Sequence, residues 1–305
     1  MSRPWSIIAL VWFMLATAMA GAAAIAVPAA AAEAIVNFPS LDGATDLIGH
    51  LTRPEGDAPR PAVVLMHGCS GLNDKKGRIF GLYRAWARAL AVQGYVTLIV
   101  DSATPRGLGQ TCSRGPDARR MWRDRPKDAY GALGYLQGQP FVKADRIALM
   151  GWSQGGGVTL LSINDKSIGR PAALAENFKI RDFAVAVSFY PGVCADIYQS
   201  RPFTNVEPNS WTTKVPLLVL IGEADVWTPF KPCDAFITAA KARGNPVELK
   251  SYPGAVHAFD APNLPRTELP QYQMHDGSIP VIGTDPDARK DAFPRVLDYL
   301  KQHLE

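Results

Sequence analysis

The 305-residue sequence has little charge imbalance and no strongly basic segment. It contains 32 lysines and arginines against 28 aspartates and glutamates, which gives a formal net charge of only +4. The basic residues are scattered, and clusters such as Arg119-Arg120 are short. A nucleic-acid-binding protein would show a basic patch or stripe instead. We therefore expect no nucleic-acid partner.

Cysteine is scarce, and its spacing excludes a common type of metal site. The four cysteines are Cys69, Cys112, Cys194 and Cys233, and no two of them form a CxxC pair. Structural zinc sites are usually built from such pairs, so we expect no bound metal. Four cysteines allow three disulfide pairings, and their spacing alone does not choose between these.

Charge is missing from a long stretch near the N-terminus. Arg3 precedes an apolar run and then an alanine-rich region, which is the order of a secretory signal peptide. We predict a signal peptide over residues 1–32, cleaved after Ala32 or Ala34, and no stable membrane insertion after cleavage. The alternative is an uncleaved anchor, because residues 6–32 are uncharged and could span a bilayer. Export to the periplasm or the exterior would expose the cysteines to oxidising conditions.

No linker, repeat or low-complexity run divides residues 33–305. Short apolar runs predict strands at Ala62–Met66, Tyr95–Val100, Ile147–Met150, Phe183–Phe189, Pro216–Ile221 and Val247–Tyr252. Helical spacing predicts helices that include 79–93, 128–136, 233–241 and 288–304, and two edge strands are expected at 35–38 and 46–52. Uniformly apolar strands separated by helices indicate a mostly parallel sheet covered on both faces. We predict a single α/β domain.

The segment Gly151–Gly155, GWSQG, fits the G-x-S-x-G pattern of a nucleophile elbow and follows a predicted strand. A strand that turns sharply into a helix strains the central residue and crowds the residues two positions before and after it, which favours glycine there. Such a turn lifts the serine hydroxyl above the strand end, next to a helix N-terminus. We predict that Ser153 is a nucleophile; an inert serine in a glycine-rich turn is the alternative.

A nucleophilic serine needs a base to take its proton, and the base needs a carboxylate to orient it. After an elbow of this type the acid precedes the histidine in the chain. We predict Asp225, just past a buried strand, as the acid and His257, in the loop after the last strand, as the base. The weaker candidates are Glu223, Asp234 and Asp196 for the acid and His275 and His303 for the base.

An oxyanion hole would complete this site. We predict the backbone N–H groups of Gln154, after the nucleophile, and of Cys69, in the glycine-containing loop His67–Gly71, as its donors. His67 is expected to hold this loop by a hydrogen bond. Three aromatic residues that flank the loops are predicted to line an apolar pocket, with core packing as the alternative: Trp152, Tyr190 and Trp227.

Five segments together resemble the dienelactone hydrolase family of α/β-hydrolases: His67–Gly71, Asp101–Gly107, Gly151–Gly156, Gly222–Asp225 and Tyr252–Asp260. The likeness extends from about Ala44 to the C-terminus. It implies an α/β-hydrolase fold with a sheet of about eight strands, and the same roles for Ser153, Asp225 and His257. The family archetype has cysteine at the elbow, where this chain has serine. The family's arginines that contact the substrate carboxylate do not map onto this sequence. Candidate anion contacts are Arg78, Arg106 and Arg114, and ordinary surface arginines are the preferred interpretation of all three.

In such a fold Cys69 and Cys112 follow neighbouring strands, as do Cys194 and Cys233, which favours these two disulfides.

We expect a serine hydrolase that cleaves carboxylic ester or lactone bonds of a small molecule through an acyl-enzyme, without a cofactor. The alternatives are a serine peptidase or acyltransferase on the same fold, and a non-catalytic protein that uses the fold for binding.

Overall fold

The computed structural model describes Met1 and residues 32–113, 115–167, 169–171 and 181–305. Most of the predicted signal peptide (residues 1–32) and Arg114 therefore lie outside the described residues. Within those described ranges, no helix has the length and apolar character needed to cross a membrane.

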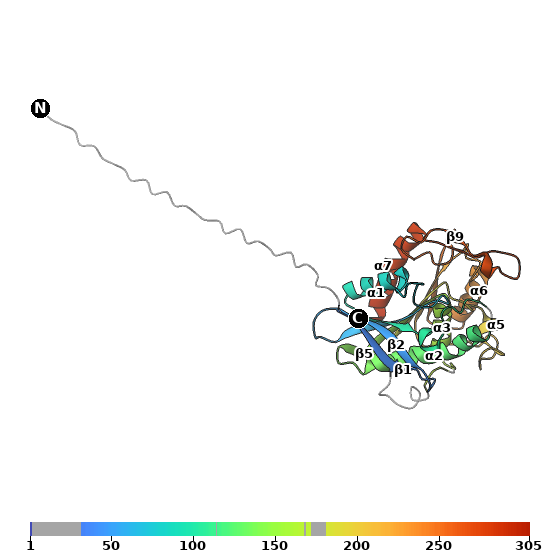
Figure 1. The fold of residues 1–305 in the computed structure, drawn as a ribbon, viewed down its shortest axis with the longest axis horizontal. Helices are drawn as coiled ribbons and strands as arrows, with labels where there is room; N and C mark the ends of the chain where they lie inside the picture. The colour runs from blue at the N-terminus through green and yellow to red at the C-terminus, as the bar shows by residue number, and fades with distance from the viewer. Residues whose placement is uncertain (2–31, 114, 168, 172–180) are drawn as a thin grey trace.

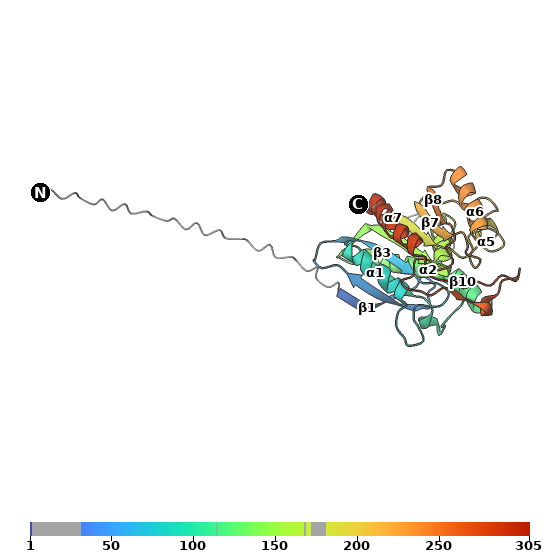
Figure 2. The same ribbon diagram turned by 90° about the horizontal axis from the view of Figure 1, so that it is seen from above.

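An eight-stranded sheet forms the centre of the molecule (Figures 1 and 2). Its strands lie in the order β1-β2-β4-β3-β5-β6-β7-β8. They are β1 (Ala32–Pro39), β2 (Asp46–Arg53), β3 (Arg60–Met66), β4 (Val96–Asp101), β5 (Val142–Trp152), β6 (Val185–Phe189), β7 (Leu217–Gly222) and β8 (Val247–Tyr252). The pairs β1–β2 and β2–β4 are antiparallel, and all the others are parallel. The predicted mostly parallel sheet of about eight strands is confirmed.

Helices cover both faces of this sheet, which explains why its central strands are apolar along their whole length. The helices are α1 (Gly81–Val92), α2 (Pro116–Gln137), α3 (Gln154–Ile163), α5 (Asp196–Gln199), α6 (Phe230–Ala242) and α7 (Pro286–Leu304), with short 3-10 turns at Thr104–Arg106 and Pro270–Tyr272. One face carries α1 and α7, which meet where the rings of Trp86 and Phe293 lie 5.0 Å apart. The other face carries α2 and α3 (Figure 1).

Besides the short helix α5 and the two 3-10 turns, two features of the structure were not predicted from the sequence. The first half of α2 was not predicted because its buried side includes Asp124 and Arg125, which interrupt an apolar stripe. A small hairpin of β9 (Thr267–Glu268) and β10 (Val281–Ile282) also lacks a signal, because each strand has only two residues. This hairpin contributes to the site described below.

The carboxyl ends of the parallel strands bring the sequence-predicted residues to one edge of the sheet. Cys69 follows β3, Ser153 follows β5, Asp225 follows β7 and His257 follows β8. These positions are far apart in the sequence and become neighbours only through the strand order.

Candidate active site

Ser153 occupies the sharp turn between β5 and α3. Its backbone has φ 53° and ψ −113°, which is a strained conformation for a residue with a side chain. A Cβ atom added to Gly151 would overlap the carbonyl group of Gly155, and one added to Gly155 would overlap the carbonyl group of Met66. The two glycines of the motif are therefore required by close backbone contacts, and the turn leaves the Ser153 side chain partly exposed.

Asp225 and His257 form a buried pair. The Nδ1 atom of His257 lies 2.6 Å from Oδ2 of Asp225, and both side chains are almost inaccessible to solvent. The Thr228 hydroxyl donates to the same Oδ2 at 2.6 Å, and the backbone N–H groups of Trp227 and Thr228 donate to Oδ1 at 2.8 and 3.0 Å. This set of donors fixes the carboxylate, which in turn fixes the tautomer and the orientation of the imidazole.

The loop that carries His257 is fastened to the unpredicted hairpin. The His257 N–H donates to the Val281 carbonyl at 3.2 Å, and the Gly283 N–H donates to the His257 carbonyl at 3.0 Å. The rings of Tyr190 and Trp227 pack against the imidazole at centroid distances of 4.6 and 5.0 Å. Backbone and ring contacts therefore limit the movement of the imidazole in several directions.

Ser153 opens into a cavity of about 440 Å³ that is also lined by Gln154, Trp227 and Thr228. Thr228 touches both members of the buried pair, since its hydroxyl also lies 3.3 Å from Nδ1 of His257. In the part of the chain that the structure describes, no hydrogen bond joins the Ser153 hydroxyl to the imidazole. Hydrogen bonds of this kind often tighten only when a substrate is bound.

The rival acid and base candidates have other surroundings. Glu223 accepts from the Ser251 hydroxyl in an exposed position, and Asp196, at the start of α5, accepts from the Asn209 N–H in another exposed position. His303 packs on Tyr299 in the terminal helix. Two further candidates lie elsewhere: Asp234 within α6, and His275 on the cavity wall. Among the described contacts, only His257 and Asp225 form a histidine–carboxylate pair within 4.0 Å.

Cys69 and Gln154, whose N–H groups are the predicted oxyanion donors, line the same cavity as Ser153. Gln154 is the first residue of α3, so its N–H has no partner within the helix. Cys69 forms a disulfide with Cys112, and its carbonyl accepts from the Thr111 N–H at 2.7 Å. The second disulfide joins Cys194 to Cys233, so the structure contains both of the favoured pairings.

Arg125, which was not predicted from the sequence, binds to the side chain of Gln154 and to the loop that contains Cys69. Its guanidinium is fully buried and donates to the His67 carbonyl at 2.6 Å and to Oε1 of Gln154 at 2.9 Å. The Thr111 hydroxyl donates to the same Oε1 at 3.1 Å. Burial lowers the pKa of Arg125 to about 10, so it remains a cation at neutral pH. A buried arginine in a charged helical segment has no sequence signal that separates it from a surface residue.

His67 is buried within the loop that contains Cys69. Its Nδ1 lies 2.6 Å from the Gly68 carbonyl, and its Nε2 accepts from the Ser102 N–H at 3.3 Å. These partners require a neutral ring with its proton on Nδ1. Burial, together with the charge of Arg125, lowers the pKa of His67 to about 3. These contacts agree with the expectation that His67 holds the loop.

We expect His67 to make the protein sensitive to acid. Because its pKa falls from 6.5 to about 3 on folding, the unfolded chain takes up a proton first as the pH is lowered. The contribution of the neutral His67 ring to the free energy of unfolding is therefore fully present above about pH 6.5. It is lost progressively as the pH falls toward about 3, because protonation then favours the unfolded chain. Urea unfolding across this window should show a smaller loss in His67→Gln than in the wild type. A His275→Gln control should follow the wild type, and parallel curves for His67→Gln would contradict the prediction.

Two of the three aromatic residues predicted to line the pocket are buried in the core and do not line this cavity. Trp152 and Tyr190 are both about 1% exposed, and only Trp227 is on the wall. The indole of Trp152 donates to Oδ2 of Asp260 at 2.9 Å, and the hydroxyl of Tyr190 donates to Oδ1 at 2.7 Å. Their polar atoms therefore face a buried carboxylate, and the prediction that both line the pocket is wrong.

Asp260 itself is a further residue that sequence reasoning missed. It also accepts from the indole of Trp86 at 2.8 Å, so three side chains donate to one fully buried carboxylate. Burial raises the pKa of Asp260, and the three donors oppose that rise. Its sequence signals were its place three residues after His257 and its position at the end of the segment Tyr252–Asp260 that resembles the family.

The arginines considered as anion contacts have other partners. Arg106 is buried and pairs with Asp42 and Asp128, each at 2.7 Å, so it is not available to a substrate. Arg78 pairs with Asp74 on the surface at 2.8 Å. Across the described ranges, no group of three or more histidine, cysteine, aspartate or glutamate side chains is arranged to hold a metal ion.

Comparison with known proteins places this site in a family. Residues 47–304 match the model of the dienelactone hydrolase family. The chain belongs to this family. Its fold is therefore the α/β-hydrolase fold, and the protein is a hydrolase. The resemblance expected from the sequence is confirmed.

Relatives within and beyond the family show how far this likeness extends. A Bradyrhizobium protein named "Probable 2-oxo-3-(5-oxofuran-2-ylidene)propanoate lactonase" is 27% identical over 84% of this chain and 90% of its own length. Dipeptidyl aminopeptidase BIII of Pseudoxanthomonas mexicana is 26% identical, but this chain spans only 43% of that peptidase. Among solved structures, a dienelactone hydrolase-like promiscuous phosphotriesterase from metagenomic libraries has a TM-score of 0.64 at 21% identity, covering 91% of this chain and all of its own. An esterase from Thermogutta terrifontis has a TM-score of 0.59 at 17% identity, covering 88% and 90%.

Proposed function

We propose that this member of the dienelactone hydrolase family is a serine hydrolase that cleaves carboxylic ester or lactone bonds through an acyl-enzyme. The observation that carries the proposal is the buried Asp225–His257 pair, 2.6 Å apart, at the same sheet edge as the Ser153 elbow. The side chains of Asp225 and His257 are almost completely buried, while Ser153 remains accessible from the cavity. This contrast suits a nucleophile served by an oriented base.

The proposed reaction begins with attack of the Ser153 Oγ on the substrate carbonyl carbon. His257 takes the hydroxyl proton on Nε2, while its Nδ1–H donates to Asp225. The backbone N–H groups of Cys69 and Gln154 stabilise the oxyanion. The tetrahedral intermediate then collapses, and His257 gives its proton to the departing alkoxide, which leaves an acyl group on Ser153.

Hydrolysis of the acyl-enzyme repeats these steps with water. His257 removes a proton from the water as its oxygen attacks the acyl carbon, and it returns this proton to Oγ as the acid leaves. The cation of Arg125, which holds both the loop of Cys69 and the side chain of Gln154, supports the proposal by fixing the two donors. In a lactone the alcohol and the acid belong to one molecule, so a single hydroxy acid is released.

We further propose that the protein is exported after removal of residues 1–32. The two disulfides support this proposal, because structural disulfides persist mainly in oxidising compartments. Cleavage after Ala32 would leave β1 almost complete, whereas cleavage after Ala34 would remove its first three residues.

Covalent labelling tests the proposed nucleophile. A fluorophosphonate probe reacts with a serine only when a base activates it, so the wild type should take up about one probe per chain, on the peptide that contains Ser153. Ser153→Ala should take up none. Ser70→Ala, which removes an exposed hydroxyl from the neighbouring loop, should label like the wild type. Labelling of another serine, measured by peptide mass spectrometry, would refute the assignment.

A further inference from the structure

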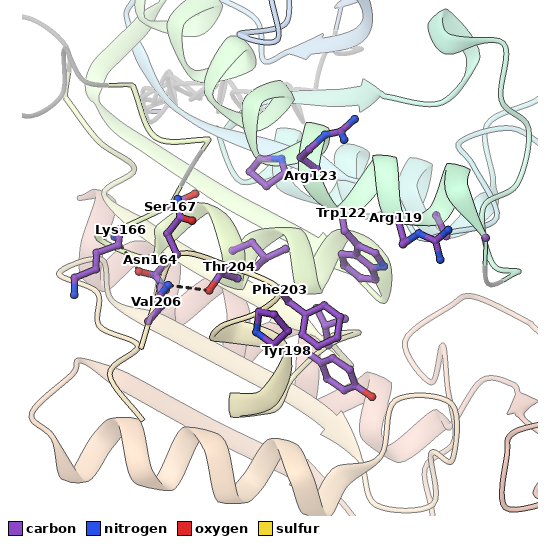
Figure 3. A pocket seen from close by; sticks show the side chains of 17 residues that line it. Arg119, Trp122, Arg123, Asn164, Lys166, Ser167, Tyr198, Phe203, Thr204 and Val206 are labelled. Carbon is purple, nitrogen blue, oxygen red and sulfur yellow. Dashed lines mark hydrogen bonds between the residues drawn. The ribbon is translucent and has the colours of Figure 1, made fainter. Parts of the chain in front are cut away.

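A second cavity lies next to the one that contains Ser153. It has a volume of about 570 Å³, within the range of about 300–1,000 Å³ that is common for small-molecule sites. Its wall is mostly apolar and includes Trp122, Pro126, Leu161, Tyr198, Phe203 and Val206. Figure 3 shows the rings of Trp122, Phe203 and Tyr198 gathered at one end of this cavity, with Asn164 and Lys166 at the other.

The two cavities adjoin each other. Ala118 and Trp122 of α2, together with Val193 after β6, line both of them. Trp122 is fitted closely against the elbow, because a Cβ added to Gly157 or Gly192 would press on its ring. Because the two cavities share these three residues, the second cavity begins where the wall of the Ser153 cavity ends, on the side of Trp122.

The second cavity lies away from the imidazole. Trp227 and Thr228, which contact His257, line only the cavity of Ser153, and Tyr190 lines neither. In the proposed reaction the departing alcohol takes its proton from His257, so it has to lie on the imidazole side. The second cavity is then left for the other half of the ester, which is the acyl group.

Exposed aromatic side chains give this cavity a surface that suits an apolar ligand. Tyr198 and Phe203 are 46% and 62% exposed, and their rings lie 5.6 Å apart. Ile197, beside them, is also 62% exposed. Large apolar side chains that gather at the mouth of a cavity commonly mark a binding site.

We propose that the second cavity binds a bulky, apolar acyl group, and that the substrates are esters of such acids. This inference rests on the proposed function and names the substrate class of the same site. It excludes short acyl groups such as acetyl as the preferred substrates, because these would leave the second cavity empty.

A series of nitrophenyl esters with one leaving group and acyl chains from acetyl to decanoyl tests the proposal. Each methylene that is fully buried in the cavity should raise kcat/KM by about fourfold. Burial of about half of the extra methylenes of an octanoyl chain is then enough for octanoyl esters to exceed acetyl esters by at least about 30-fold. A flat or falling series, with the acetyl ester still cleaved, would overturn the acyl cavity and leave the proposed function standing. Absence of both ester cleavage and fluorophosphonate labelling would instead refute the proposed function.

Variants of the residues that line the second cavity test whether the preference for long acyl chains arises there. Leu161→Trp fills the cavity from α3, and we expect the octanoyl-to-acetyl ratio of kcat/KM to fall at least about tenfold. Phe203→Ala, at an exposed position that tolerates change, should lower the same ratio by about threefold to tenfold. Ala235→Phe, an exposed site on α6 that lines neither cavity, is the matched control and should leave both rates unchanged. A ratio unchanged in both wall variants would overturn the proposal.

Binding of the acid product gives a readout that needs no turnover. Octanoate should quench the tryptophan fluorescence of Ser153→Ala, because Trp122 is part of the cavity wall. Addition of Leu161→Trp to that variant should weaken the affinity for octanoate at least about tenfold, measured by calorimetry. Equal octanoate affinity with and without the added substitution would contradict the assignment of the cavity.

Discussion

Replacing Ser153 by alanine is expected to lower kcat for a nitrophenyl ester by about 10⁴-fold or more, with the fold unchanged. The loss should be this large because, in the proposed mechanism, no other group forms the acyl-enzyme. The backbone bonds of residue 153 do not depend on the hydroxyl: its N–H donates to the Phe189 carbonyl, and its carbonyl accepts from Gly157 and Gly192. Alanine meets the same backbone constraint at φ 53° that serine does.

A check of the fold and a chemical control make this result decisive. Thermal unfolding and circular dichroism of Ser153→Ala should match the wild type, which would separate a lost nucleophile from a lost fold. Ser153→Cys provides a chemical control, since it restores a nucleophile of the type that the family archetype carries, and it should retain part of the activity. Ser153→Ala activity above about one hundredth of the wild type would refute the proposed mechanism.

The fold could be predicted from the sequence because its elements have strong local signals. The central strands are uniformly apolar runs, and parallel strands buried on both faces require such runs. The nucleophile elbow could be predicted for a similar reason. The close backbone contacts of Gly151 and Gly155 leave no room for a side chain, so glycine is required at both positions. Steric demands of this kind appear directly in the residue types.

The surroundings of the site could not be predicted, because they depend on partners that are distant in the sequence. Trp152 and Tyr190 have the apolar character of pocket residues, and only the position of Asp260 shows that their polar atoms face inward. The buried Arg125 is equally hidden, since its partners are a carbonyl and an amide oxygen from two other elements. Arg106 was considered as an anion contact, with an ordinary surface position as the preferred interpretation. It fits neither, for the same reason: it is buried, and Asp42 and Asp128 neutralise it.

Replacing Asp260 by alanine is expected to lower the free energy of unfolding by about 3–6 kcal/mol. The substitution would leave the N–H groups of Trp86 and Trp152 and the hydroxyl of Tyr190 buried without their acceptor. Each unsatisfied buried donor costs about 1–3 kcal/mol, and the upper part of the summed range is offset because the desolvation cost of the buried carboxylate is also removed. Urea unfolding of the purified protein measures the loss. Asp291→Ala is a matched control, because this partly exposed carboxylate also accepts from a tyrosine, and its removal should cost less than about 1 kcal/mol.

The same substitution should also reduce turnover, because Asp260 links three parts of the site. Trp152 precedes the nucleophile, Tyr190 packs on the imidazole at 4.6 Å, and Asp260 follows His257 by three residues. We expect kcat to fall about 10–100-fold in Asp260→Ala through misalignment of these groups. Asp260→Asn keeps an acceptor for the two indoles and should retain most of both stability and kcat. Equal stability of Asp260→Ala and the wild type would mean that the cost of burying the carboxylate equals the gain from its three hydrogen bonds. That result would refute a role for Asp260 in holding the site together.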